Sequence, residues 1–169
     1  NNRWVWSATF TIGSGWNVSW SPLNIHDDYG TGSLTLVADG NGNAAAAWTQ
    51  TGQDGSSHNV YVAQYKLSSG FGFGQVVNNA SHLMRTGLDI ALNPQGLPMV
   101  AWCEWQLSIN GSMIPSHIVS NRYRSDSGWT GPRTVFDSNI KIWMCKVGSA
   151  SNQSVSLVWS EGDQENSQT

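Results

Sequence analysis

The chain has 169 residues, enough for one domain with a buried core, and its hydrophobic fraction of 39% is not that of a disordered protein. Charged residues make up only 11%, the net charge is −3 and Lys and Arg never form a run, which argues against nucleic acid as a partner because phosphate binding needs a basic patch. No stretch approaches the roughly 18 apolar residues of a membrane span, and none resembles a signal peptide, so an exported protein would be present here as its mature form or an excised part.

The order of residues predicts strands and turns throughout. Residues 8–18 hold two aromatic positions around a turn, with Phe10 followed by Ser14-Gly15 and Trp16. Four strands are then predicted near residues 33–38, 43–50, 59–66 and 74–78. The link at 39–42 contains Asn-Gly, which readily takes the positive φ angles of a type I′ hairpin turn. No helical periodicity appears over a useful length, so we predict an all-β fold.

Two landmarks recur along the chain. Trp48, Trp102 and Trp159 lie in similar apolar runs, 54 and 57 residues apart. An aromatic residue followed by Ser-Gly and a second aromatic residue occurs three times, and this landmark has nearly the same spacing. The three pairs are Phe10 with Trp16, Tyr65 with Phe71, and Tyr123 with Trp129. Two landmarks that share one period indicate a repeated unit of about 55 residues.

The repeat divides the chain into a single domain of three units, at about 25–80, 81–137, and 138–169 together with 1–24. The third unit is split, because the chain opens with the aromatic-Ser-Gly-aromatic half and closes with the Trp159 half. We expect these halves to pair as one sheet, which would protect the edges of the terminal strands. The second strand of each unit is apolar on both faces, as at 44–48 and 99–102, so we also expect each sheet to be covered on both sides.

The spacing of Asp39, Gly42 and Trp48, followed by Tyr65 and Phe71, resembles the repeats of secreted bacterial β-propellers and loosely the Asp-box repeats of sialidase-type propellers. This resemblance implies four-stranded blades around an axis, one of them closed by strands from both termini, and an extracellular or cell-surface location. A propeller has about 4–8 blades, so three units imply either a homodimer that completes a six-bladed ring or a piece of a longer propeller chain. A β-trefoil or β-prism is the alternative three-fold fold.

Residues that recur in every unit are expected to be structural. Trp48, Trp102 and Trp159 are expected in the core. The position two residues after each Trp carries Gln50, Glu104 or Glu161, which we expect to hydrogen-bond a loop backbone. The other interpretation is a glycoside hydrolase that uses Asp89, Glu104 or Glu161, since such enzymes work with paired carboxylates.

The candidate ligand-binding residues are of two kinds. Trp16, Phe71 and Trp129 recur after Ser-Gly, where their rings either stack on sugars between units or simply pack. Trp105 occurs in one unit only, as do Trp20 and Trp143. Asp89 corresponds to Thr35, and in a propeller it would face the central channel near Arg85 or form an ordinary surface charge.

No metal or cofactor is predicted. The segment 39–43 partly resembles a calcium loop, but it lacks the closing Glu and a hairpin turn is the better interpretation. The cluster at 26–29 is interpreted as a polar loop, and Cys103 and Cys145 as buried thiols rather than a disulfide. The sequence therefore favours a secreted, non-enzymatic, lectin-like module that binds carbohydrate, over a structural or adhesive surface protein or a hydrolase.

Overall fold

A computed structural model describes residues 3–19, 21–24, 30–52, 55, 57–79, 83–105, 116–150 and 154–162. Every regular element in these ranges is a β-strand, and all strand pairs are antiparallel, which confirms the predicted all-β class. Over the same ranges, the chain contains no helix that could span a membrane.

The first complete unit is a five-stranded sheet. Its strands are β3 (Thr31–Ala38), β4 (Ala44–Thr51), β5 (His58–Lys66), β6 (Gly70–Phe71) and β7 (Gln75–Val76). They run in the order β3-β4-β5, and β6 and β7 both pair with β5 as two short pieces of one outer strand. The four strands predicted from the sequence in this unit are therefore confirmed, with shifts of a few residues at their ends.

The second complete unit repeats this topology. It contains β8 (Met84–Leu92), β9 (Pro98–Trp105), β10 (Ser116–Arg124), β11 (Gly128–Trp129) and β12 (Arg133–Ser138). Again the first three strands are paired in order, and the last two both pair with the third. The repeated landmarks in the sequence thus correspond to a repeated sheet.

The turn between the first two strands of each unit is longer than the predicted type I′ link. Asp39 N donates to Asn43 O at 2.9 Å, which leaves three residues in the loop, and the positive φ of 82° falls on Gly42. The Asp39 carboxylate organises this loop by accepting hydrogen bonds from the backbone N–H groups of Asn41 and Asn43. These bonds give Asp39 a structural role in the loop.

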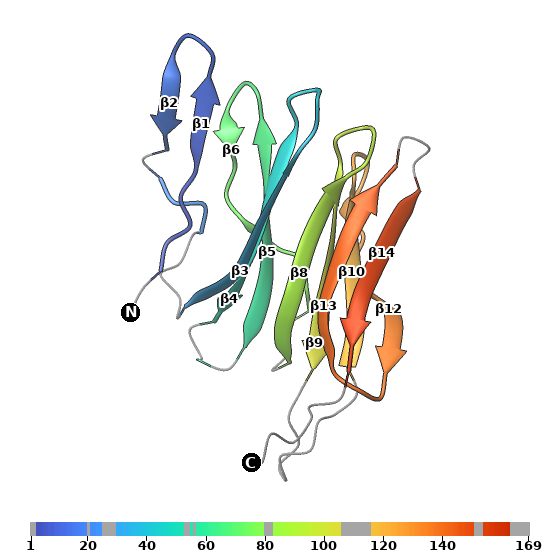
Figure 1. The fold of residues 1–169 in the computed structure, drawn as a ribbon. Coiled ribbons are helices and arrows are strands. Elements are labelled where there is room, and N and C mark those ends of the chain that lie inside the picture. The colour runs from blue at the N-terminus through green and yellow to red at the C-terminus, as the bar shows by residue number, and fades with distance from the viewer. Residues whose placement is uncertain are drawn as a thin grey trace.

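The chain ends form two further sheets rather than the single sheet expected from the sequence. The N-terminal pair is β1 (Ala8–Thr11) with β2 (Gly15–Val18), and the C-terminal pair is β13 (Ile142–Ser149) with β14 (Val155–Glu161). Figure 1 shows the sheets stacked in chain order, with these two pairs at opposite ends of the row. Within one copy the pairs do not join because two complete units separate them.

Each terminal pair nevertheless has the local structure of half a unit. Val5 N donates to Asn24 Oδ1 at 2.9 Å, just as Val60 N donates to Asn78 Oδ1 at 2.6 Å in the first complete unit. The N-terminal pair therefore corresponds to β5–β7, the outer half of a unit. At the other end, Ala150 N donates to Ser154 O at 2.9 Å, in the same type of bond that closes the loop between β3 and β4. The C-terminal pair therefore corresponds to the inner half.

Three apolar layers hold the sheets together, and burial in these layers is the main source of stability. The central layer joins the two complete units, and the other layers join each complete unit to the neighbouring terminal pair. The side chains of β4 at 45–48 are buried on both faces of the sheet. Ala45 and Ala47 pack towards the second complete unit, whereas Ala46 and Trp48 pack towards the N-terminal pair. The predicted covering of both faces is therefore confirmed for this strand, where the small Ala side chains let neighbouring sheets approach closely, but not for every sheet, because Leu34, Leu36 and Trp159 are exposed.

Candidate functional site

The three aromatic pairs predicted from the repeat form the same local structure. Phe10 with Trp16, Tyr65 with Phe71, and Tyr123 with Trp129 lie edge to face, with ring centroids 5.4, 5.3 and 5.5 Å apart. The Gly before each second ring has a positive φ of 75–80°, which brings the two rings to the same side of the hairpin. The recurring aromatic residues are thus partners of each other, whatever else they contact.

These pairs differ in what covers them. Trp16 is 71% exposed at the end of the stack, whereas Phe71 and Trp129 are half-buried between sheets. The indole Nε1 of Trp129 donates to Gln75 Oε1 of the first complete unit at 3.1 Å. Trp129 therefore packs against the central apolar layer, and Phe71 packs against the layer next to the N-terminal pair.

A pocket of about 340 Å³ lies in front of Phe71, between the N-terminal pair and the first complete unit. We call it the hairpin pocket. The aromatic residues Tyr65 and Phe71 line one side, and Leu67, Ser69 and Gly70 complete that side. The opposite side is made of polar side chains from the N-terminal pair, namely Ser7, Thr9, Thr11, Asn17 and Ser19.

The polar side of the hairpin pocket was not predicted, although a signal for it is present. Ser7, Thr9 and Thr11 alternate along one strand, so their side chains point to the same face. Asn17 is the cross-strand partner of Thr9. The alternation of Ser7, Thr9 and Thr11 indicates a pocket wall only once the position of the neighbouring sheet is known. From the sequence alone, the same pattern indicates a solvent-exposed strand face.

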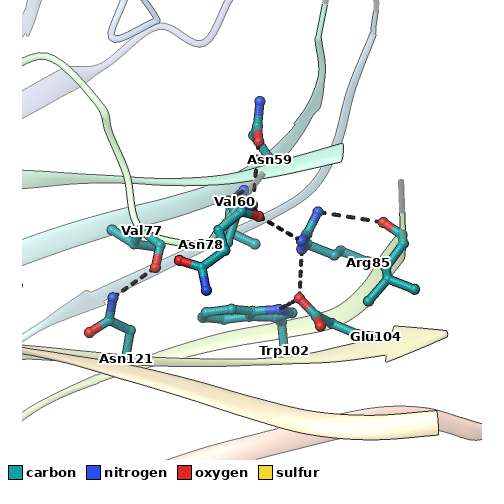
Figure 2. A network of polar contacts seen from close by, with 10 residues as sticks. Asn59, Val60, Val77, Asn78, Arg85, Trp102, Glu104 and Asn121 are labelled. Carbon is teal, nitrogen blue, oxygen red and sulfur yellow. Dashed lines mark hydrogen bonds and ion pairs between the residues drawn. The ribbon is translucent and has the colours of Figure 1, made fainter. Parts of the chain in front are cut away.

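Arg85 and Glu104, two of the residues considered for chemistry, form a buried ion pair. Arg85 Nε lies 2.9 Å from Glu104 Oε1, and their side chains are 1% and 13% exposed. Figure 2 shows that the same carboxylate oxygen accepts a hydrogen bond from the indole of Trp102, at 2.8 Å. Arg85 also donates to the backbone oxygens of Leu83 and Asn79. Burial lowers the pKa of Arg85, and the neighbouring Glu104 opposes that shift.

In the two complete units, the recurring Gln or Glu side chain accepts a hydrogen bond from an indole, a partner that the sequence analysis did not predict. Trp48 Nε1 donates to Gln50 Oε1 at 3.1 Å, in the same way that Trp102 donates to Glu104. Both side chains satisfy a buried indole N–H two residues earlier on the same strand. Since the neutral Gln50 accepts the same indole bond, that bond does not require the charge of Glu104. The charge instead pairs with Arg85.

Asp89 joins the innermost strands of three sheets. Its Oδ1 accepts from Thr35 Oγ1 of β3 at 3.2 Å and lies 3.4 Å from Lys146 Nζ of β13, and its Oδ2 accepts from the backbone N–H of Val147 at 3.0 Å. Three donors thus occupy this carboxylate, which is mostly buried. The contacts give Asp89 a structural role in holding neighbouring units in register.

Trp105 lies beside a cation of the chain itself. Lys141 Nζ is 4.3 Å from the Trp105 ring centroid and 3.9 Å from that of Trp143, so the ammonium group lies against both rings. Cation–π contacts of this kind are favourable for both rings. The Trp105 ring, a candidate for stacking on a ligand, is thus in contact with Lys141. Trp20 and the loop at 26–29 lie outside the described residues.

The described part of the chain holds no cluster of three His, Cys, Asp or Glu side chains suited to a metal ion. Cys103 and Cys145 are free and buried, which confirms the interpretation as thiols. A hydrogen bond with Cys103, together with burial, raises the pKa of the Cys145 thiol, and Cys145 Sγ donates to Gly87 O. Comparison with protein-family models, with curated proteins and with solved structures finds no match.

Proposed function

We propose that this protein is a non-enzymatic module that binds neutral carbohydrate in the hairpin pocket. The observation that carries the proposal is the lining of that pocket. It combines two aromatic rings with six hydroxyl-bearing or amide side chains, and no charged residue is among its lining residues. A volume of about 340 Å³ is within the range of about 300–1,000 Å³ that is typical of small-molecule pockets.

The chemistry of this lining suits a sugar. A sugar ring offers several hydroxyl groups along its edges and an apolar C–H face. Ser, Thr and Asn side chains both donate and accept hydrogen bonds, so Thr9 and Asn17 can match hydroxyl groups in either direction. The rings of Tyr65 and Phe71 supply an apolar surface for the C–H face. The lack of charge favours a neutral sugar over a sialic or uronic acid, because a carboxylate is normally held by Arg or Lys.

For the architecture, we propose that the units are blades of a β-propeller, and that two copies of the chain complete a six-bladed homodimeric ring at the cell surface or outside the cell. The repeated antiparallel sheets, stacked face to face in chain order, support this arrangement. Three units are too few to close a propeller, which typically has about 4–8 blades, whereas six units are within that range.

A hydrolase based on Glu104 has less support. Its carboxylate is held by Trp102 and Arg85 and is mostly buried. Asp89 is similarly occupied by three donors.

The proposal is tested by glycan-array screening followed by calorimetric titration of the best neutral ligand. Phe71→Ala is expected to weaken binding at least tenfold, because it removes the ring at the back of the pocket. Phe73→Ala is the matched control, since Phe73 is exposed nearby and is not part of the lining. Thermal melting of each variant verifies that it is folded.

A second pair of variants isolates the polar side. Thr9→Val keeps the shape and the strand propensity but removes the hydroxyl group, and we expect it to weaken binding, whereas Thr9→Ser keeps the hydroxyl group and should retain most of the affinity. Folded wild-type protein that binds no glycan on the array would refute the proposed function. Binding that is unchanged by both Phe71→Ala and Thr9→Val would place the site elsewhere.

A further inference from the structure

Residues at equivalent positions of the repeat differ sharply in exposure at the two ends of the stack. Trp48 and Trp102 are fully buried, whereas Trp159, at the same position of β14, is 42% exposed. In the first complete unit, Tyr61 of β5 stacks on Trp48, with centroids 5.6 Å apart and planes 7° apart. Within the residues that the structure describes, no strand pairs with β14 as β5 pairs with β4, and the Trp159 ring is partly open.

The N-terminal pair presents the strand that β14 lacks. Trp6 has the same position relative to Phe10 as Tyr61 has relative to Tyr65. Trp6 is 53% exposed, and Trp4 and Phe10, on the same face of that segment, are exposed as well. Figure 1 places β1 and β2 at the end of the row farthest from β14. The open edge of β14 and the unpartnered β1–β2 pair thus belong to the same chain, but they lie at opposite ends of the stack and cannot meet within one copy.

A second mismatch involves the face of β3. Leu88 and Ile90 of β8 are 5% and 4% exposed, because β3 and β4 of the preceding unit pack against β8. Their equivalents Leu34 and Leu36 of β3 are 65% and 66% exposed, because the N-terminal pair has no inner strands to cover this face. Large apolar side chains left exposed next to each other on one strand face are typical of an interaction surface.

We infer that β14 of one copy pairs with β1 of a second copy and completes a four-stranded unit between them. The repeat sets the register. Since Trp48 is opposite Tyr61 and Ala44 is opposite Tyr65, Trp159 is opposite Trp6 of the second copy, and Val155 is opposite its Phe10. The inner strands of the joined unit then cover Leu34 and Leu36 of the second copy, as β3 and β4 do for β8.

A second copy is the occupant that fits best, because each end of the chain supplies the half-unit that the other end needs. Pairing also removes two open sheet edges whose backbone groups would otherwise invite aggregation. The contact is heterologous, so it forms either a closed ring or an open chain, and six units are an ordinary number for closure. This inference rests on the ring proposed above and specifies its interface.

The first test is the mass in solution, measured by light scattering on the 169-residue chain. Wild type is expected to have twice the mass of the 18.4 kDa chain. Leu36→Glu is expected to reduce this to a single chain, because it places a charge where the partner sheet packs. Leu67→Glu is the matched control, since Leu67 is 83% exposed on the turn after β5, away from the interface, and this variant should remain dimeric.

The second test locates the contact. Chains carrying Trp6→Cys are mixed with chains carrying Trp159→Cys under mild oxidation, and we expect a disulfide between copies, found by mass spectrometry of the linked peptides. Leu67→Cys mixed with Trp159→Cys should give none. A wild-type dimer that persists in Leu36→Glu and gives no Trp6–Trp159 link would refute this pairing but leave the proposed dimer standing. A monomeric wild type would refute the dimer and the pairing together, whereas glycan binding by that monomer would still support the proposed function.

Discussion

Replacing Glu104 by Gln is expected to destabilise the protein strongly, although it changes only one atom. The variant leaves the Arg85 guanidinium, which is 1% exposed, without this charge partner. Removing one partner of a buried ion pair costs about 3–5 kcal/mol. The new carboxamide still offers an oxygen to the Trp102 indole, as Gln50 does to Trp48, so we expect the low end, about 3 kcal/mol. For a chain of this size that corresponds to a Tm about 6–12 °C lower.

The repeat supplies an internal control for this prediction. Arg85 is opposite Glu104 in the second complete unit, and Thr31 is opposite Gln50 at the same place in the first. The double variant Arg85→Thr/Glu104→Gln therefore copies a pair that the fold already uses, and it should recover at least half of the lost stability. Urea unfolding followed by tryptophan fluorescence measures all three proteins. A fully stable Glu104→Gln, or a double variant no better than the single one, would refute the reasoning.

Two smaller predictions concern the first loop and the thiols. Asp39→Asn should lower Tm slightly, because it keeps the two backbone N–H bonds that Asn93 also accepts in the second unit but loses the bond from Asn43 Nδ2, whereas Asp39→Ala should lower Tm more. Hydrogen bonds from the side chain and backbone of Asn43 lower the pKa of Asp39 from 3.8. The stability contributed by the ionised carboxylate is therefore complete above pH 3.8 and is lost as the pH falls through the lower pKa of the folded state. The Tm values of wild type and Asp39→Asn should accordingly converge as the pH is lowered from 7 to 2. Cys103 and Cys145 should not react with a disulfide reagent in the folded protein and should both react in denaturant, and rapid reaction of the native thiols would contradict their burial.

The local structure was largely predictable because it depends on neighbouring residues. The four strands of the first unit follow from alternating and continuous apolar runs. The positive φ of Gly70 and Gly128 follows from the Ser-Gly turn between two aromatic residues. The burial of Trp48 and Trp102 follows from their recurrence in apolar strands.

The candidate site was predictable only in part. The sequence predicts Phe71 as an aromatic residue between units. The hydroxyl groups opposite it belong to residues about 60 positions earlier in the chain, and no local sequence pattern links them to Phe71. Arg85 and Asp89 looked available for ligand, yet each is bound by partners that the sheet pairing and sheet stacking supply.

The amino-acid sequence by itself determined an all-β chain, the position of its repeats and the residues that turn each hairpin, since these depend on side chains within a few positions of each other. It also indicated that the two ends are halves of one unit. Only the tertiary structure decided that these halves lie at opposite ends of a stack, because the packing of each sheet on its sequence neighbour fixes where the ends are. The exposed Trp159, Trp6 and Leu36 that result from this packing are a property of the assembled sheets, and no segment of the sequence specifies them alone.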